Sequence, residues 1–183
     1  MNGKTFRHGI VDSMREIVFG LEDSLVSTLG AVTGIAVGTG SQYIVILSGL
    51  VLITAEATSM AAGSYLSTKH AREADTLYHT HNNFEVQEEA SHPVRASLVM
   101  GAFYLAGGVV PLVPYFLLDV RAAVLPAIGI TAATLFLVGV WAASFTQTSK
   151  LKSGIEMTAV SLAAAFIGYA IGRLVATYFG VDV

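Results

Sequence analysis

The sequence IVFGLEDSLVSTLGAVTGIAV, residues 17–37, is an apolar stretch without lysine or arginine that carries Glu22 and Asp23 side by side. Its length suffices for a helix to cross about 30 Å of hydrocarbon, which takes roughly 20 residues. A carboxylate inside a bilayer costs several kcal/mol, and such residues usually face a bundle interior or an ion pathway. The stretch therefore predicts a membrane-spanning helix whose acidic residues have a function.

The composition of the whole chain also indicates a protein embedded in lipid. Of its 183 residues, 54% are hydrophobic and 13% are charged, whereas a soluble domain carries about 25% charged residues. The net charge of -3 gives no reason to expect a nucleic acid partner. Cysteine is absent, which excludes disulfides, thiolate metal sites and iron–sulfur clusters.

Five apolar segments are long enough to span a bilayer, so we expect an all-α integral membrane protein. The expected spans are residues 17–39, 43–67, 95–118, 122–145 and 155–179, so that 17–67 holds the first two and 94–183 the other three. Residues 1–16 are expected to form an amphipathic cytoplasmic lead-in. The polar segment 68–93 has too few large apolar residues for a core, and we expect a helical extension and a loop there.

Lysine and arginine are distributed unequally between the two ends of these spans. Eight lie on one side, namely Lys4, Arg7, Arg15, Lys69, Arg72, Arg95, Lys150 and Lys152. Arg121 and Arg173 lie on or toward the other. Because positive residues concentrate on the cytoplasmic side, we expect a cytoplasmic N-terminus and 68–93 segment, with the C-terminus outside.

Small residues recur at four-residue spacing in three spans, a pattern that lets helix backbones approach closely in lipid. They are Gly30, Gly34 and Gly38 in the first span, Ser59, Gly63 and Ser67 in the second, and Ala164, Gly168 and Gly172 in the fifth. The odd number of spans, without an internal repeat, excludes an inverted-repeat transporter within one chain. We therefore expect a homodimer with an ion pathway at its two-fold interface.

Asp23 is the first candidate ligand for a cation. Consecutive residues of a helix point about 100° apart, so Glu22 and Asp23 cannot both face one narrow pathway. Asp23 and Ser27 share a face. The alternative is an ion pair or a place at the membrane surface, but Arg173 is the only basic residue beyond the first position of an expected span.

Glu56 and Met60 lie one helical turn apart in the apolar run IVILSGLVLITAEATSMAAG, residues 44–63. With no basic partner nearby, Glu56 is expected to be protonated or to bind a cation. A carboxylate beside a thioether suits a borderline ion such as Fe²⁺ better than Mg²⁺ or Ca²⁺. Met60 taken alone is better explained by packing, because methionine commonly fills gaps between helices.

The polar segment 68–93 carries four of the five histidines. Three spacings there can chelate a metal, namely His70-x-x-Glu73, His79-x-His81 and Glu89-x-x-His92. Metal capture or sensing is one interpretation, and a solubilising role is the other. A di-iron carboxylate centre would need two Glu-x-x-His motifs and two further glutamates, and only one such motif is present.

Glu156 is expected in the first turn of the fifth span. A carboxylate there is stabilised by the helix dipole, and feeding an ion into the pathway is the alternative role. The chain has no P-loop, no H-E-x-x-H and no nucleophile elbow. We therefore expect neither an enzyme nor a prosthetic group, and any uphill transport must use an ion or proton gradient.

Four segments, in the same order, resemble the vacuolar iron transporter family. They are REIVFGLEDSLVSTLGAVTGIA, SMAAGSYLSTK, GGVVPLVPYFLL and KSGIEMTAVSLAAAFIGYAIGRL, at residues 15–36, 59–69, 107–118 and 152–174. The resemblance implies a five-span homodimer that exports Fe²⁺, and often Mn²⁺, from the cytoplasm in exchange for protons. It also implies that the pathway lies at the dimer interface, with Asp23 and Met60 as ligands.

The chain departs from eukaryotic members of that family in two ways. Their second span has a glutamate two turns before the methionine, where this chain has Leu52, and its own acid, Glu56, is one turn closer to Met60. They also insert a long metal-collecting domain between spans two and three, which here is missing or reduced to residues 68–93. We expect a short-loop member in a prokaryotic cytoplasmic membrane, with Glu56 as a ligand or proton carrier.

Two other functions remain as alternatives. One is a non-transporting membrane anchor that binds metal through residues 68–93 and recruits a soluble iron-storage partner. The other is a transporter of a different divalent cation, because carboxylates alone do not select Fe²⁺.

Overall fold

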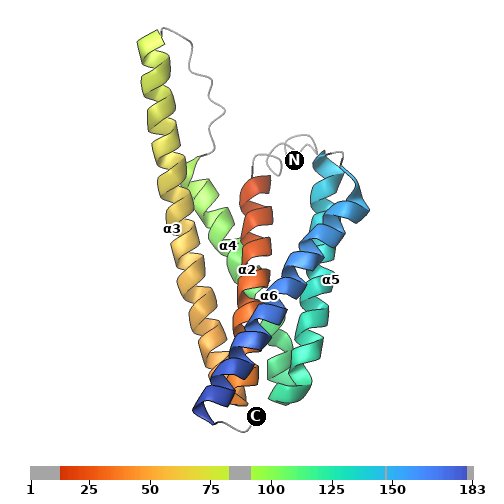
Figure 1. Ribbon diagram of the computed structural model, residues 1–183. Helices are drawn as coiled ribbons and strands as arrows, with labels where there is room; N and C mark the ends of the chain where they lie inside the picture. The colour runs from red at the N-terminus through yellow and green to blue at the C-terminus, as the bar shows by residue number, and fades with distance from the viewer. Residues whose placement is uncertain (1–12, 83–91, 147, 181–183) are drawn as a thin grey trace.

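The computed structural model describes residues 13–82, 92–146 and 148–180, with backbone only for 78–82. It consists of five helices: α2 (Met14–Thr39), α3 (Gln42–Asn82), α4 (Pro93–Leu117), α5 (Val120–Thr146) and α6 (Lys150–Phe179). All five are long and apolar enough to cross a membrane. The expected five-span, all-α architecture is confirmed (Figure 1).

Two helices extend well beyond the apolar segments that predicted them. Helix α3 has 41 residues and continues past the expected span to Asn82, so that its tip projects beyond the other helices (Figure 1). Helix α6 begins at Lys150, ahead of the expected start at residue 155. Polar residues thus extend α3 after its apolar run and α6 before its apolar run, because helix formation itself does not require apolar side chains.

Helix α2 lies at the centre of the bundle and contacts each of the other four helices. In the most apolar 18-residue stretch of each helix, 44% of the residues of α2 are buried, against 22% of those of α3. Helix α3 is therefore a peripheral helix. Gly40 follows α2 in the left-handed conformation, with φ 60, and its N–H donates to the Ala36 carbonyl at 3.0 Å. That glycine cap permits the tight turn that makes α2 and α3 a hairpin.

The small residues of the first and fifth spans, whose spacing indicated close helix packing, lie against each other in the structure. Gly30, Gly34 and Gly38 lie against Ala164, Gly168 and Gly172 of α6, so that a β-carbon at Gly34 would stand 2.9 Å from the Gly168 carbonyl oxygen. The third small-residue stripe has a different environment. A β-carbon at Gly63 would have no heavy atom within 4 Å in the part of the chain that the structure describes.

Candidate functional site

Side chains from three helices meet in a polar cluster within the apolar bundle. The Ser27 hydroxyl of α2 donates a hydrogen bond to Glu56 Oε2 of α3 at 2.9 Å. The Tyr104 hydroxyl of α4 donates to the same carboxylate oxygen. The Ser27 and Tyr104 oxygens are themselves 2.9 Å apart. We call Asp23, Ser27, Glu56 and Tyr104 the carboxylate cluster.

Asp23 belongs to this cluster through two interactions. Its carboxylate interacts with the Tyr104 hydroxyl and with the charge of Glu56. Like charges repel strongly where the dielectric constant is low, and a bound cation or a proton shared between the two groups relieves that repulsion. The cluster is therefore suited chemically to accept a positive species.

Two glycines allow α4 to lie close enough to α2 to build the cluster. A β-carbon at Gly20 would stand 3.1 Å from the Met100 carbonyl oxygen and 3.4 Å from the Tyr104 nitrogen. A β-carbon at Gly107, one turn farther along α4, would stand 3.2 Å from the Leu21 carbonyl oxygen. Because the two backbones nearly touch, the fully buried Tyr104 side chain reaches Ser27 and Glu56.

Met60 lies in a separate pocket of about 490 Å³, one turn from Glu56 toward the end of the bundle where α2 begins. The residues that line it include Arg15, Glu16, Ser59, Met60, Gly63, Ser67 and Met100. Glu16 is only 7% exposed, and its Oε2 has no hydrogen-bond partner among the described residues. A buried carboxylate oxygen without a partner is costly, so Glu16 is a further candidate ligand.

The sequence interpretation did not identify Glu16 or Tyr104 as site residues. Glu16, Gly20, Asp23 and Ser27 follow one another at spacings of four, three and four residues, which puts them on one side of α2. From Glu16 to Ser27 this polar stripe extends about 16 Å along the axis, roughly half of the hydrocarbon thickness. The spacing of Glu16 from Asp23 was a usable signal, but nothing in the sequence linked Tyr104 to Glu56.

A single chain brings Asp23 together with Glu56, and it brings Met60 together with Glu16. The pairing of Asp23 with Met60 that the family resemblance implies runs between two copies. It stays a prediction.

The expected metal-binding positions of residues 68–93 lie mostly on the projecting part of α3. His70 Nδ1 is 3.4 Å from Glu73 Oε2, and both side chains are exposed. His79 and His81 fall in the last turns of α3, but their side chains are outside the described part of the structure. Glu89 also lies outside the described residues. His92 is exposed and directly precedes α4.

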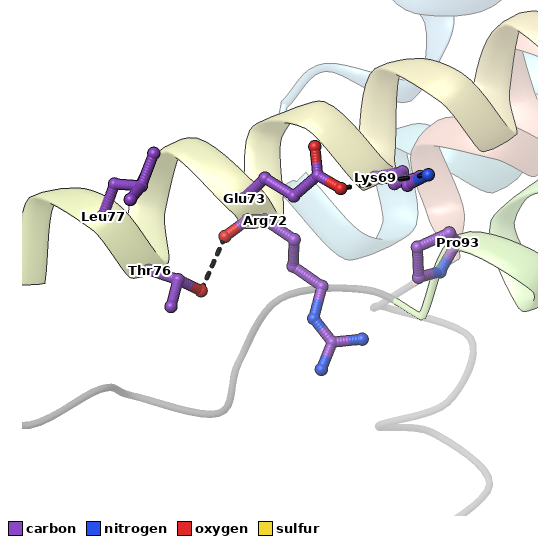
Figure 2. Close-up of a pocket in the computed structure, with 6 residues that line it drawn as sticks. All are labelled: Lys69, Arg72, Glu73, Thr76, Leu77 and Pro93. Carbon is purple, nitrogen blue, oxygen red and sulfur yellow. Dashed lines mark hydrogen bonds and ion pairs between the residues drawn. The ribbon is translucent and has the colours of Figure 1, made fainter. Parts of the chain in front are cut away.

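A pocket of about 590 Å³ separates the α3 projection from Pro93 (Figure 2). Lys69 and Arg72 both line it, and the Lys69 ammonium is 3.9 Å from the Glu73 carboxylate. Two cations at its wall make this pocket unfavourable for a metal ion. Across the described residues no group of three or more His, Asp or Glu side chains is close enough to hold a metal.

The expected position of Glu156 in the first helical turn is wrong. Because α6 begins at Lys150, Glu156 lies in the second turn, where the helix dipole falls off. Its side chain is 65% exposed and lies 3.8 Å from the Lys152 ammonium. Stabilisation by the helix terminus therefore does not explain Glu156.

Comparison with known proteins gives a consistent result over nearly the whole chain. The model of the VIT family matches residues 14–87 and 72–173. An uncharacterized protein of Methanocaldococcus jannaschii is 30% identical over 169 residues, which cover 87% of this chain and 88% of that protein. Vacuolar iron transporter 1 of Eucalyptus grandis is 26% identical over 208 residues, with 84% of each chain covered.

Vacuolar iron transporter 1 of Arabidopsis thaliana is 24% identical over 214 residues, which cover 88% of this chain and 86% of that protein. The five apolar helices and these relatives together establish an integral membrane protein of a metal transporter family, rather than an enzyme family. From its fold and from these matches, we conclude that the chain belongs to the VIT family.

Proposed function

We propose that the chain forms a homodimer that exports Fe²⁺, with Mn²⁺ as a second substrate, from the cytoplasm in exchange for protons. The observation that carries this proposal is the carboxylate cluster, where Asp23 and Glu56 from two helices interact across one hydroxyl inside the apolar bundle. Two plant relatives with the printed name vacuolar iron transporter 1 support iron as the transported ion.

The proposal of a homodimer rests on the outer face of α3. Ser59, Gly63 and Ser67 are exposed there, and they border the same pocket as Met60. A second copy packed by the two-fold axis against this small-residue stripe would close the pocket. It would also double the ligands, giving two carboxylate clusters and two thioethers, a mixed hard and soft set that suits Fe²⁺.

Each candidate residue then has a place along one route. Asp23 and Met60 bind the ion, and Glu56 binds it or carries the proton. The cytoplasmic intake consists of Glu156, His70, Glu73, His79, His81, Glu89 and His92. The lysines and arginines concentrated at the end of the bundle where α2 begins support a cytoplasmic N-terminus and an outer C-terminus. The proposed membrane is a prokaryotic one.

The test is Fe²⁺ flux into proteoliposomes, with and without a pH gradient. Asp23→Ala should reduce flux to the background of empty liposomes while the protein keeps its fold and its dimer, because the ion loses a charged ligand. The matched control is Glu22→Ala, which removes the adjacent carboxylate on another face of α2 and should leave most of the flux. Unchanged flux in Asp23→Ala would reject the proposal.

The projecting tip of α3 favours one second candidate, a membrane anchor that binds metal and recruits a soluble iron-storage partner. The exposed His70 and Glu73 side chains, 3.4 Å apart, are the observation behind it. Metal-dependent capture of such a storage protein, together with no flux of any ion from a panel of divalent metals, would favour the anchor. Flux of another metal in preference to Fe²⁺ would correct the substrate.

A further inference from the structure

The pocket of about 590 Å³ between the α3 projection and the start of α4 is unsuited to the transported cation, because two positive side chains line it. Its lining residues are Lys69, Arg72, Glu73, Thr76, Leu77 and Pro93. The volume is within the range of about 300–1,000 Å³ that ligand sites occupy. With two cations against one carboxylate, the pocket has a net positive charge, which favours an anion as its ligand.

Arg72 is the residue of this pocket whose charge is available to a ligand. Its side chain extends away from the α3 axis, on the side of the helix where Pro93 lies (Figure 2). None of the ion pairs among the described residues includes its guanidinium. A guanidinium carries a planar fork of N–H donors that matches two oxygens of one phosphate group. Arg72 is therefore suited to anchor a phosphate.

Lys69 supplies the second cation of the pocket. Its ammonium is 3.9 Å from Glu73 Oε1, and the two side chains are 48% and 57% exposed. An exposed ion pair of this kind contributes little to stability, so Lys69 can exchange the carboxylate for a phosphate oxygen at little cost. A phosphate in the pocket would then have donors on two successive turns of one face of α3.

The depth of the pocket indicates a lipid as the source of that phosphate. Lys69 and Arg72 follow Ser67, the end of the expected second span, by about 3 and 8 Å along the helix axis. Pro93 precedes the start of the expected third span by two residues, so the opposite wall lies at a similar depth. The headgroup layer of a bilayer is about 5–8 Å thick on each side. Both walls of the pocket therefore lie at the level of the lipid phosphates.

We propose that this pocket binds the phosphate group of an anionic phospholipid, with Arg72 as the anchor and Lys69 as the second donor. Basic pockets between membrane helices are suited to anionic headgroups. A zwitterionic lipid offers the same phosphate, but its own ammonium group balances the charge. The bound headgroup joins the α3 projection to the start of α4. This site goes beyond the proposed function and does not depend on it.

The test is native mass spectrometry of the delipidated full chain in detergent, titrated with phosphatidylglycerol or with phosphatidylcholine. The first phosphatidylglycerol should bind in preference to phosphatidylcholine. Arg72→Gln should weaken that binding by about tenfold or more, the effect of losing one charge-assisted hydrogen bond. The matched control is Lys150→Gln, which removes a positive charge at the same end of the bundle but outside the pocket, and should weaken binding much less.

Equal weakening in Arg72→Gln and Lys150→Gln would overturn the proposal, because it would show a general attraction between charged surfaces. Arg72→Lys keeps the charge and loses the fork, so its affinity should fall between those of Arg72→Gln and the wild type. Arg72 is exposed, so neither variant should change the unfolding midpoint of the lipid-free chain. Wild-type affinity in Arg72→Gln would also overturn the proposal.

Inorganic phosphate distinguishes the two sources of a phosphate group. Added alone to the wild-type chain, it should not displace phosphatidylglycerol. Displacement that is lost in Arg72→Gln would identify a soluble phosphate as the ligand and overturn the assignment to lipid. The readout is bound lipid rather than flux, so a chain that retains phosphatidylglycerol through Arg72 but transports no metal would reject the proposed function and support this site.

Discussion

One side of α2 carries two stretches with the same spacing and opposite chemistry. In the first half of the helix, Glu16, Asp23 and Ser27 face α3 and α4 through polar side chains. In the second half, the glycines 30, 34 and 38 face α6 through backbone alone. With Gly20 counted between Glu16 and Asp23, successive positions in both stretches lie three or four residues apart, so spacing by itself does not distinguish them.

The difference shows how one helix combines rigidity with chemistry. In the glycine half the backbones of α2 and α6 touch, so that a β-carbon at Gly168 or Gly172 would overlap the Gly30 or Gly34 carbonyl oxygen. In the polar half α2 meets its neighbours through hydroxyls, carboxylates and a pocket of about 490 Å³ beside Met60. We infer that the glycine half fixes α2 in place and that the polar half exchanges cations.

The largest effect should come from placing a side chain in the glycine half. Gly168→Leu should cost about 3 kcal/mol or more, because a β-carbon there would overlap the Gly30 carbonyl oxygen and the two helices must separate. The measurement is the thermal unfolding midpoint in detergent. Gly129→Leu is the control, since a β-carbon at Gly129 meets no heavy atom within 4 Å among the described residues. An equal decrease of the unfolding midpoint in both variants would contradict the inference that the glycine half fixes α2 in place.

An intermediate effect should follow from the same substitution on α3. Gly63→Leu should leave the fold of one chain intact, since the described neighbours leave open space around Gly63. If the Ser59, Gly63 and Ser67 stripe is the dimer interface, the added side chain should weaken dimerisation by about tenfold or more, through overpacking of about 1–3 kcal/mol. Cross-linking yield and light scattering in detergent measure this. A dimer as stable as that of Gly129→Leu would place the interface elsewhere.

The smallest effect should occur at Ser27, where the polar half gives way to the glycine half. Ser27→Ala removes one of the two hydroxyls that donate to Glu56, while Tyr104 still donates. The hydrogen bond that is lost should therefore account for about 0.6–1.5 kcal/mol. Ser24→Ala is the control, because among the described residues the Ser24 hydroxyl bonds only the Leu21 carbonyl of its own helix, at 3.1 Å. A larger decrease of flux in Ser24→Ala than in Ser27→Ala would contradict the assignment of the polar half.

The five spans could be predicted because hydropathy is a local property of the sequence. The contact between α2 and α6 could also be predicted, because glycines at four-residue spacing in two spans usually mark the faces through which helices pack closely in lipid. The hydrogen bond between Tyr104 and Glu56 was not predictable. It joins residues far apart in the chain, and it depends on which faces of α3 and α4 meet and at what depth.

Three acidic residues show the limits of assigning environments from hydropathy. Glu16 was expected in the polar lead-in, yet it is buried in the first turn of α2 because the helix begins at Met14. Glu156 was expected at the start of a helix that in fact begins earlier. Glu56 was expected to be protonated or to hold a cation, and in the structure the hydroxyls of Ser27 and Tyr104 donate to it. In each case neighbouring side chains, rather than the apolar run, decide the environment.

The uninterrupted length of α3 has a mechanical consequence. No proline interrupts this helix, and its tip lies about 39 Å from Glu56 along the axis at 1.5 Å per residue. A tilt of about 5° around the level of Glu56 would displace the tip by about 3 Å, by simple geometry of a rod of that length. Helix α3 is thus a lever with its short arm in the membrane. A force applied to its tip in the aqueous phase therefore changes the tilt of the membrane segment that carries Glu56.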